Sequence, residues 1–351
     1  MRHLALAVAL VCLGALGLRA EDSYPIKVYP CPRFEAGPAI DGSLADACWA
    51  KAPVVSGFTR YDKPQLMAVQ TSFRMGYDAT HLYLGVHCDE PKAKQLAPSF
   101  AGRDSGEVFH AETIELFLDP RHNHADYYQI AANLAGSLYD SFKSDPSWDS
   151  ATRVAARVLA DGWDLEMAIP WSEIGVDAPK PGMVLGFNVC RDRYAGGDRE
   201  WSNWSQTMAN FHDPVRFAHL VLSPTEAMVG GLEKEFRKGD RFGPILVFST
   251  AGYAGKAYGA MAREMLRRLD ALIAEVEAEG KTEAAASARE EVSTRLHVAR
   301  EEMEPVRRRL EAAEALDGAV WTRMSVELSA LEAKLRALLW DARLAALLKR
   351  I

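Results

Sequence analysis

The 351-residue chain lacks an excess of positive charge, a long membrane-spanning stretch and the common catalytic motifs. Its formal net charge is −7, so it offers no basic surface to the phosphates of a nucleic acid. No phosphate-binding loop, GxSxG or HExxH motif occurs, and we predict that the chain is not an enzyme. What is present is a hydrophobic content of 48%, enough to build a folded core.

The first 20 residues predict an export signal. Arg2 precedes an apolar run over 4–18, and Ala20 is a small residue of the kind that precedes a signal cleavage site. The run is shorter than the ~20 residues that span a bilayer comfortably. We therefore predict that 1–20 is removed, that the mature protein is extracellular or periplasmic, and that no membrane span remains.

Four cysteines remain after that cleavage: Cys31, Cys48, Cys88 and Cys190. In an oxidising compartment they could form two disulfides, in any of three pairings. Their spacing differs from the close CxxC pairs of a tetrahedral zinc site. The alternative is buried free thiols, because free cysteine is among the most buried residue types. The sequence leaves both open.

Composition divides the chain near residue 255. All 13 phenylalanines lie before this point, and 256–351 has 17 basic and 17 acidic residues. Apolar residues recur there at alternating steps of four and three, with Gly280 and Gly318 between the repeats. This pattern predicts a three-helix bundle or helical hairpin with coiled-coil-like packing, joined by a connector over 226–255. The helices could serve self-association or protein docking, or could pack only on themselves.

The front part, 21–225, has the pattern of short strands. Alternating or short apolar runs predict strands at 69–77, 82–88, 113–118, 127–134, 154–159, 163–169, 183–193 and 217–222. Turn residues such as Asp119-Pro120, Asp161-Gly162 and Pro181-Gly182 separate them. We predict a mainly β protein: an antiparallel β-sandwich followed by the α-helical region.

Five short motifs occur in order along this part. They are IDGSL at 40–44, LYLGV at 82–86, IELFLD at 114–119, GWDLE at 162–166, and GFNVCR at 186–191 followed by EWSNWS at 200–205. Together they resemble the family 9 carbohydrate-binding modules, a β-sandwich family of the DOMON-like group, over roughly 35–222. The resemblance implies an exported, non-catalytic domain that binds a poly- or oligosaccharide. Members of the family are often joined to glycoside hydrolases, which links this chain to carbohydrate catabolism.

The resemblance also implies a site. Phe109 stands where the family places one aromatic wall, six residues before Glu115, which matches its hydroxyl-binding acid. Trp204, or its neighbour Trp201, matches the second wall. Strand alternation independently places Glu115 on the face opposite Ile114, where it is free for a ligand.

Asn133 and Arg191 complete the predicted carbohydrate-binding set as hydrogen-bonding side chains. The chain departs from the best-known sugar binders at Ala131, where those members have an arginine. No cofactor is required by this prediction. The family resemblance allows calcium, but the sequence does not identify its ligands.

Other interpretations compete with sugar binding. DOMON-like relatives include haem-dependent electron-transfer proteins, and His81, His87 and Met75 would be the candidate axial ligands. A degenerate module could also act only through its helical tail. His122 and His124 alternate as metal ligands would, but their context favours an exposed turn.

Overall fold

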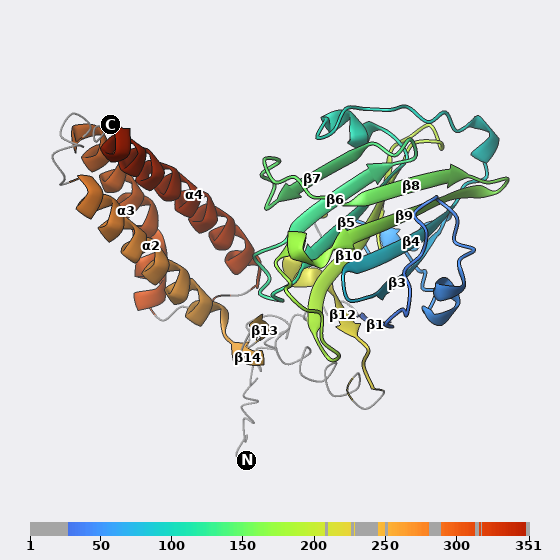
Figure 1. The fold of residues 1–351 in the computed structure, drawn as a ribbon, viewed down its shortest axis with the longest axis horizontal. Helices are drawn as coiled ribbons and strands as arrows, with labels where there is room; N and C mark the ends of the chain where they lie inside the picture. The colour runs from blue at the N-terminus through green and yellow to red at the C-terminus, as the bar shows by residue number, and fades with distance from the viewer. Residues whose placement is uncertain are drawn as a thin grey trace, which may run out of the picture.

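The computed structural model describes residues 27–207, 210–225, 228, 245–249, 252–280, 289–312, 316 and 318–348 (Figure 1). The export signal predicted at 1–20 lies outside the described residues, as does most of the connector predicted at 226–255. Figure 1 shows the two large sheets gathered at one end of the molecule and three helices at the other.

An eight-stranded sheet forms one layer of the sandwich. Its main path runs β1, β12, β10, β5, β6, β7, while β11 pairs with β10 and β2 pairs with β11. β1 runs parallel to β12, and the other pairs of this sheet are antiparallel. The bounds are β1 (Val28–Cys31), β2 (Thr59–Arg60), β5 (Thr113–Asp119), β6 (Tyr128–Asn133), β7 (Leu138–Phe142), β10 (Val184–Arg193), β11 (Glu200–Asn203) and β12 (Ala218–Leu222).

A four-stranded antiparallel sheet forms the second layer, in the order β3, β4, β9, β8. A separate hairpin precedes the helices, and five short 3-10 helices lie in the loops of the sandwich. The bounds are β3 (Thr71–Tyr77), β4 (His81–Asp89), β8 (Arg153–Val158), β9 (Gly162–Pro170), β13 (Ile245–Ser249), β14 (Gly252–Lys256), η1 (Ala47–Lys51), η2 (Ala93–Gln95), η3 (Gly106–His110), η4 (Trp171–Ile174) and η5 (Pro214–Arg216).

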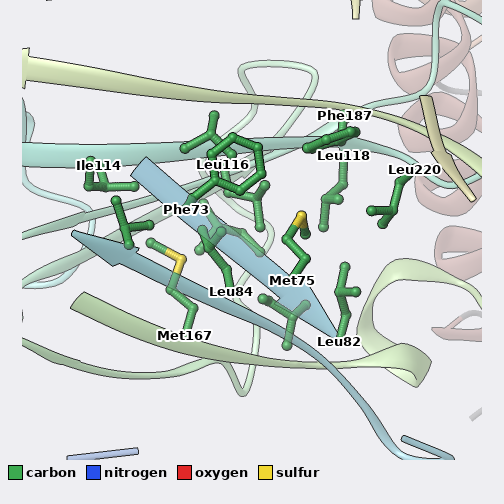
Figure 2. Packing of buried hydrophobic residues seen from close by; sticks show 14 of the residues in the cluster. Phe73, Met75, Leu82, Leu84, Ile114, Leu116, Leu118, Met167, Phe187 and Leu220 are labelled. Atoms are coloured by element: carbon green, nitrogen blue, oxygen red, sulfur yellow. The ribbon is translucent and has the colours of Figure 1, made fainter. Parts of the chain in front are cut away.

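The main core fills the space between the two sheets. Figure 2 shows Leu116 and Leu118 of β5 pointing toward Phe73 and Met75 of β3, and all four are buried. Burial of each such side chain contributes about 1.5–3 kcal/mol. Because alternate residues of a strand face opposite sides, this packing turns Glu115 to the outer face of the eight-stranded sheet. The β-sandwich prediction is confirmed.

Three helices follow the sandwich, as predicted. They are α2 (Tyr258–Gly280), α3 (Arg289–Glu311) and α4 (Gly318–Leu348). Their buried residues form one core, which includes Leu269 of α2, Met303 of α3 and Leu331 of α4. In the described part of the chain, no helix is both long and apolar enough to cross a membrane.

The four cysteines are free thiols, so the disulfide alternative is wrong. Cys31 and Cys88 lie in the core between the sheets, whereas Cys190 and Cys48 lie in two other apolar clusters. Burial raises the pKa of Cys88 to about 12, which keeps this thiol protonated. The alternative of buried free thiols holds for Cys31, Cys88 and Cys190, while Cys48 is half-buried.

The helices pack on the loop that joins β5 to β6. The carbonyl of Asn123 accepts a hydrogen bond from Trp321 Nε1 at 3.2 Å, and the Tyr258 hydroxyl lies 3.1 Å from Nδ1 of His124. His122 Nε2 is 2.6 Å from Nδ1 of His219, and all three histidines are buried. The expectation of an exposed turn is therefore wrong, because residues distant in sequence cover this loop.

Candidate functional site

Strand register brings one group of side chains together on the outer face of the eight-stranded sheet. Glu115 of β5 lies opposite Cys190 of β10, and Asp192, two residues further along β10, lies opposite Trp201 of β11. Residues two apart on a strand share a face. Glu115, Asp192 and Trp201 therefore project from three consecutive strands toward the same space.

These side chains line a cavity of about 280 Å³. Its aromatic residues are Phe109, Tyr139, Trp201 and Phe211. Its polar residues are Glu115, Gln129, Ser144, Asp192, Arg199, Asn210 and His212. A few convergent polar groups among aromatic side chains are typical of a ligand pocket.

Aromatic pairs form the walls. The ring of Phe109, on η3, meets Tyr139 of β7 edge to face at 4.8 Å. The ring of Trp201 meets Tyr61 edge to face at 5.1 Å. The guanidinium carbon of Arg199 lies 3.7 Å from the centre of the Trp201 ring, a cation–π contact at the edge of the cavity.

The floor holds two carboxyl groups. Gln129 Nε2 donates to Glu115 Oε2 at 2.6 Å, and Ser141 Oγ donates to Gln129 Oε1 at 3.2 Å. Burial raises the pKa of Glu115 to about 7, against the opposing effect of hydrogen bonds from Gln129 and Asp192. Burial and the adjacent Glu115 charge raise the pKa of Asp192 well above its usual value. Each of the two carboxyl groups is therefore easier to protonate than a carboxyl group exposed to solvent.

Two buried atoms of this site have no hydrogen-bond partner within the described residues: Oδ1 of Asp192 and Nε1 of Trp201. The Asp192 side chain is only 1% exposed. A buried polar atom without a partner costs free energy, and native proteins usually satisfy such atoms. The acceptor of Asp192 and the donor of Trp201 are therefore suited to a polar ligand.

The hairpin between β10 and β11 connects the walls. Glu112 Oε1 accepts hydrogen bonds from the backbone N–H groups of Tyr194 and Ala195, at 2.6 and 2.8 Å. The Tyr194 hydroxyl donates to the carbonyl of Phe109 at 2.8 Å. Backbone and side-chain hydrogen bonds thus join the segment of Phe109 to the hairpin that carries Arg199.

Three of the residues predicted from the sequence meet at this cavity. Phe109, Glu115 and Trp201 all line it, and they come from η3, β5 and β11. The same outer face also holds Gln129 and Asp192, which sequence reasoning missed. Strand alternation would have identified both residues. Cys190 and Ala131 pair with Glu115 across the sheet, and Asp192 and Gln129 each lie two residues from one of them, on the same face.

Trp204 is not part of the site, contrary to the prediction. It packs in the core between the sheets, 5% exposed, with its ring 5.1 Å from that of Phe73 and 5.5 Å from that of Phe187. Its Nε1 donates to the carbonyl of Ser56. Trp201 and Trp204 are three residues apart in a segment that stays paired with β10, since the N–H of Trp204 donates to the carbonyl of Val189. Strand alternation therefore places the two tryptophans on opposite faces of the sheet.

Arg191 was also wrongly predicted to contact ligand. It lies on the inner side of β10, 1% exposed, where its Nη2 is 3.3 Å from Glu112 and 3.5 Å from Glu90. Its neighbour Asp192 faces the cavity instead. Arg191 and Asp192 are neighbours on the strand, so their side chains point to opposite faces of the sheet.

Asn133 is the third correction. Its Oδ1 accepts hydrogen bonds from the N–H groups of Ala135 and Ser137, both at 3.0 Å, and its Nδ2 donates to the carbonyl of Ser99. These bonds close the turn between β6 and β7. Both ends of the amide are occupied, so Asn133 shapes the loop and does not face the cavity.

Three further tryptophans of the sandwich, Trp49, Trp163 and Trp171, are buried and lie away from the cavity. The haem ligands considered for the alternative are separated: Met75 lies in the core, whereas His87 lies toward the other side of its sheet and binds Asp164 at 2.7 Å. His122 and His124, the alternative metal ligands, each lie against another side chain of the protein, His219 and Tyr258 respectively.

Among the described residues, one group of acids has oxygen atoms close enough for a metal ion: Asp104, Asp140 and Asp149. Arg103 already occupies the space between them. Its guanidinium donates to Asp140 at 2.8 Å and to Asp149 at 2.9 Å. A cation there would have to displace this arginine, and we assign the group no calcium.

The fold and the cavity together define a carbohydrate-binding module. Residues 40–225 match the family model described as carbohydrate family 9 binding domain-like, which is more than half of the chain, and the chain belongs to this family. It is a family of binding modules, not of enzymes. No curated protein matches the chain.

Three solved structures are similar. Two are of a family 9 carbohydrate-binding module from Caldicellulosiruptor kristjanssonii. The complex with cellotriose is 18% identical, covers 57% of this chain and 95% of that chain, and has a TM-score of 0.44. The complex with glucose is 17% identical, covers 57% and 96%, and has a TM-score of 0.42. The third, a candidate carbohydrate-binding protein from Bacteroides uniformis, is 17% identical, covers 56% and 100%, and has a TM-score of 0.47.

Proposed function

We propose that the cavity on the outer face of the eight-stranded sheet binds a sugar unit of a poly- or oligosaccharide. The observation that carries the proposal is one arrangement: aromatic walls from Phe109 and Trp201 stand over a floor of Glu115 and Asp192, with the acceptor Oδ1 of Asp192 left without a partner among the described residues.

The chemistry of a pyranose matches this arrangement. A sugar ring has apolar C–H faces and a rim of hydroxyl groups, so flat aromatic rings cover the faces while carboxylates and amides bind the rim. Covering ~100 Å² of apolar surface would contribute about 2.5 kcal/mol. Gln129 is held by Glu115 and Ser141, which fixes its orientation before a ligand arrives.

The proposed role is non-catalytic. A glycosidase needs two carboxyl groups held apart on either side of the scissile bond, at about 5 Å or more. Glu115 and Asp192 instead lie together on one face of adjacent strands, at the same side of the cavity. The floor of the cavity therefore supports recognition of hydroxyl groups and not hydrolysis.

The wider proposal keeps the interpretation of the sequence. The chain would be exported after cleavage at Ala20 and would hold a polysaccharide for carbohydrate catabolism, without a required cofactor. The helices of 256–351 would provide self-association or protein docking, and self-association would raise avidity without a new contact. N-terminal sequencing of the exported protein tests the cleavage.

Retention of the whole chain on a panel of polysaccharides tests the sugar site. The panel contains cellulose, mannan, galactan, xylan and chitin, with polygalacturonate and polymannuronate as acidic members. Trp201→Ala should lower the affinity for the retained glycan by about tenfold to a hundredfold, because it removes one wall. The matched control is Trp340→Ala, since Trp340 is 68% exposed on α4 and lies outside the cavity.

Equal loss of affinity in both tryptophan variants would contradict the assignment of the site. Failure of the unaltered chain to bind any glycan in the panel would favour the alternative, a degenerate module whose function lies in its helices.

A further inference from the structure

We propose that Asp192 and Arg199 are the specificity-determining pair of this cavity: Asp192 Oδ1 accepts a hydrogen bond from one sugar hydroxyl, and the Arg199 guanidinium donates to the oxygen of the neighbouring hydroxyl. This inference rests on the proposed sugar-binding function and specifies its ligand as a vicinal diol on the sugar rim. It also assigns a function to Arg199, which sequence reasoning did not identify.

The two side chains are close, yet they do not pair. Both line the same cavity, and the positive charge of Arg199 acts to lower the pKa of Asp192 and of Glu115. Within the described residues, no ion pair joins Arg199 to either carboxylate, since no nitrogen–oxygen distance falls within 4.0 Å. The space between the charges can therefore hold a ligand group.

The pair offers complementary hydrogen-bonding groups. Asp192 is 1% exposed and its Oδ1 has no partner among the described residues, so this atom is an acceptor within the cavity. A guanidinium has five N–H donors and no acceptor. Two adjacent hydroxyl groups provide one donor and one acceptor side by side, whereas a single hydroxyl or an apolar group provides only part of this match.

Two aromatic side chains and the hairpin backbone position Arg199. The Trp201 ring supports the guanidinium at 3.7 Å, and Tyr194 lies 5.9 Å from it on the same hairpin. Glu112 fixes that hairpin through the N–H groups of Tyr194 and Ala195. The Arg199 side chain is exposed and can adjust to a ligand, while the hairpin backbone that carries it is fixed.

Charge on the sugar should be discriminated by the same pair. Two acidic side chains, Glu115 and Asp192, lie together on the floor, and negative charge on either one opposes a uronate carboxylate placed there. His212 does not offset this charge at neutral pH, since burial lowers its pKa to about 4. Removing the acid of Asp192 while keeping Arg199 should favour uronates.

The test uses the whole chain and two matched glycan pairs, galactan with polygalacturonate and mannan with polymannuronate. Arg199→Gln should lower the affinity for the retained neutral glycan by about tenfold, because a charge-assisted hydrogen bond is lost. Asp192→Asn should shift the ratio of acidic to neutral retention by about tenfold toward the acidic member. Arg157→Gln is the control, since Arg157 is exposed on β8, away from the cavity. Thermal unfolding of each variant verifies that it is folded.

The outcomes separate the two proposals. In one outcome, a neutral glycan retains the unaltered chain, but Arg199→Gln keeps its affinity and Asp192→Asn keeps its ratio of acidic to neutral retention. This outcome overturns the specificity pair and leaves the sugar site standing. Failure of the unaltered chain to bind any member of either pair or of the wider panel overturns both. The predicted loss and the predicted shift, with Arg157→Gln unchanged, support the pair.

Discussion

The two faces of the eight-stranded sheet use the same types of residue for different purposes. On the inner face, Arg191 is surrounded by carbonyl and carboxylate acceptors, and Trp204 donates its indole N–H to a backbone carbonyl. On the outer face, the neighbouring Asp192 and the nearby Trp201 each keep a buried atom without a partner in the described part of the chain. Residue type does not distinguish the faces, and neither does a missing partner alone, since Nε of Arg191 also lacks one among the described residues. What distinguishes the outer face is that its unpartnered atoms belong to residues that line a cavity.

The same contrast exists along one face. Glu115 and Asp119 both project from the outer side of β5, and both are buried. Asp119 accepts hydrogen bonds from the N–H groups of Asn123 and His124, at 3.2 and 2.7 Å, and thereby fixes the loop under the helices. Glu115 accepts a hydrogen bond from Gln129 and lies beside Asp192 at the cavity. Burial of a carboxyl group therefore does not by itself indicate a binding site; its hydrogen-bond partners must be known as well.

The largest effect should come from the inner face. Trp204→Ala should lower the free energy of unfolding by about 3–5 kcal/mol, because it leaves a cavity between the sheets beside Phe73 and Phe187. Urea unfolding measures the change, and Trp201→Ala is the matched comparison. If Trp201→Ala destabilises the protein as much as Trp204→Ala does, the distinction between the two faces fails.

A smaller effect is expected at the loop that joins the sandwich to the helices. Asp119→Ala should cost about 1–3 kcal/mol of stability, because it leaves two N–H groups without their acceptor. Glycan affinity should stay the same, since Asp119 lies outside the cavity. Unfolding and affinity measurements on one preparation test both expectations, and a loss of affinity in the folded variant would show that the two ends of β5 are coupled.

The smallest effect is a dependence on pH. The pKa of Glu115 is raised to about 7 in the folded protein from its usual 4.5, so the folded state binds more protons between those values. Its contribution to stability is complete below about pH 4.5 and is lost as the pH rises toward 7. Glu115→Gln should therefore lose less stability than the unaltered chain between pH 5 and pH 8.

Urea unfolding at several pH values gives this difference. The buried histidines with lowered pKa values are present in both proteins, and their contributions cancel in the comparison. Asp192 adds to the difference in the same direction, because removal of the Glu115 charge takes away one cause of its raised pKa. Parallel pH profiles for the two proteins would mean that Glu115 titrates normally.

Strand alternation made much of this fold predictable. The apolar positions of 113–118 indicated both a strand and the outward direction of Glu115, and the steps of four and three after residue 255 indicated three helices. Phe109 and Trp201 were accessible through the motifs that flank them. The inward positions of Trp204 and Arg191 could not be predicted in this way. The face to which a side chain points depends on where its strand ends and on which residues of the neighbouring strands it pairs with.

Long-range packing explains the remaining errors. The loop with His122 and His124 has the composition of an exposed turn, and its burial comes from Tyr258 and Trp321, which are 134 and 198 residues away from their partners. Phe211 and His212 reach the cavity through the irregular segment before β12, for which no periodic pattern exists. Neither contact is encoded in a local sequence signal.

The hydroxyl of Tyr194, on the hairpin that leads to Trp201, donates to the backbone carbonyl of Phe109 and ties together the segments on either side of the gap between Phe109 and Trp201. The width of the gap is thus set when the chain folds, before any guest arrives. Preorganisation of this kind reduces the ordering that association requires. Under the proposed function, the cavity would bind and release successive ends or branches of a glycan without rebuilding its surface.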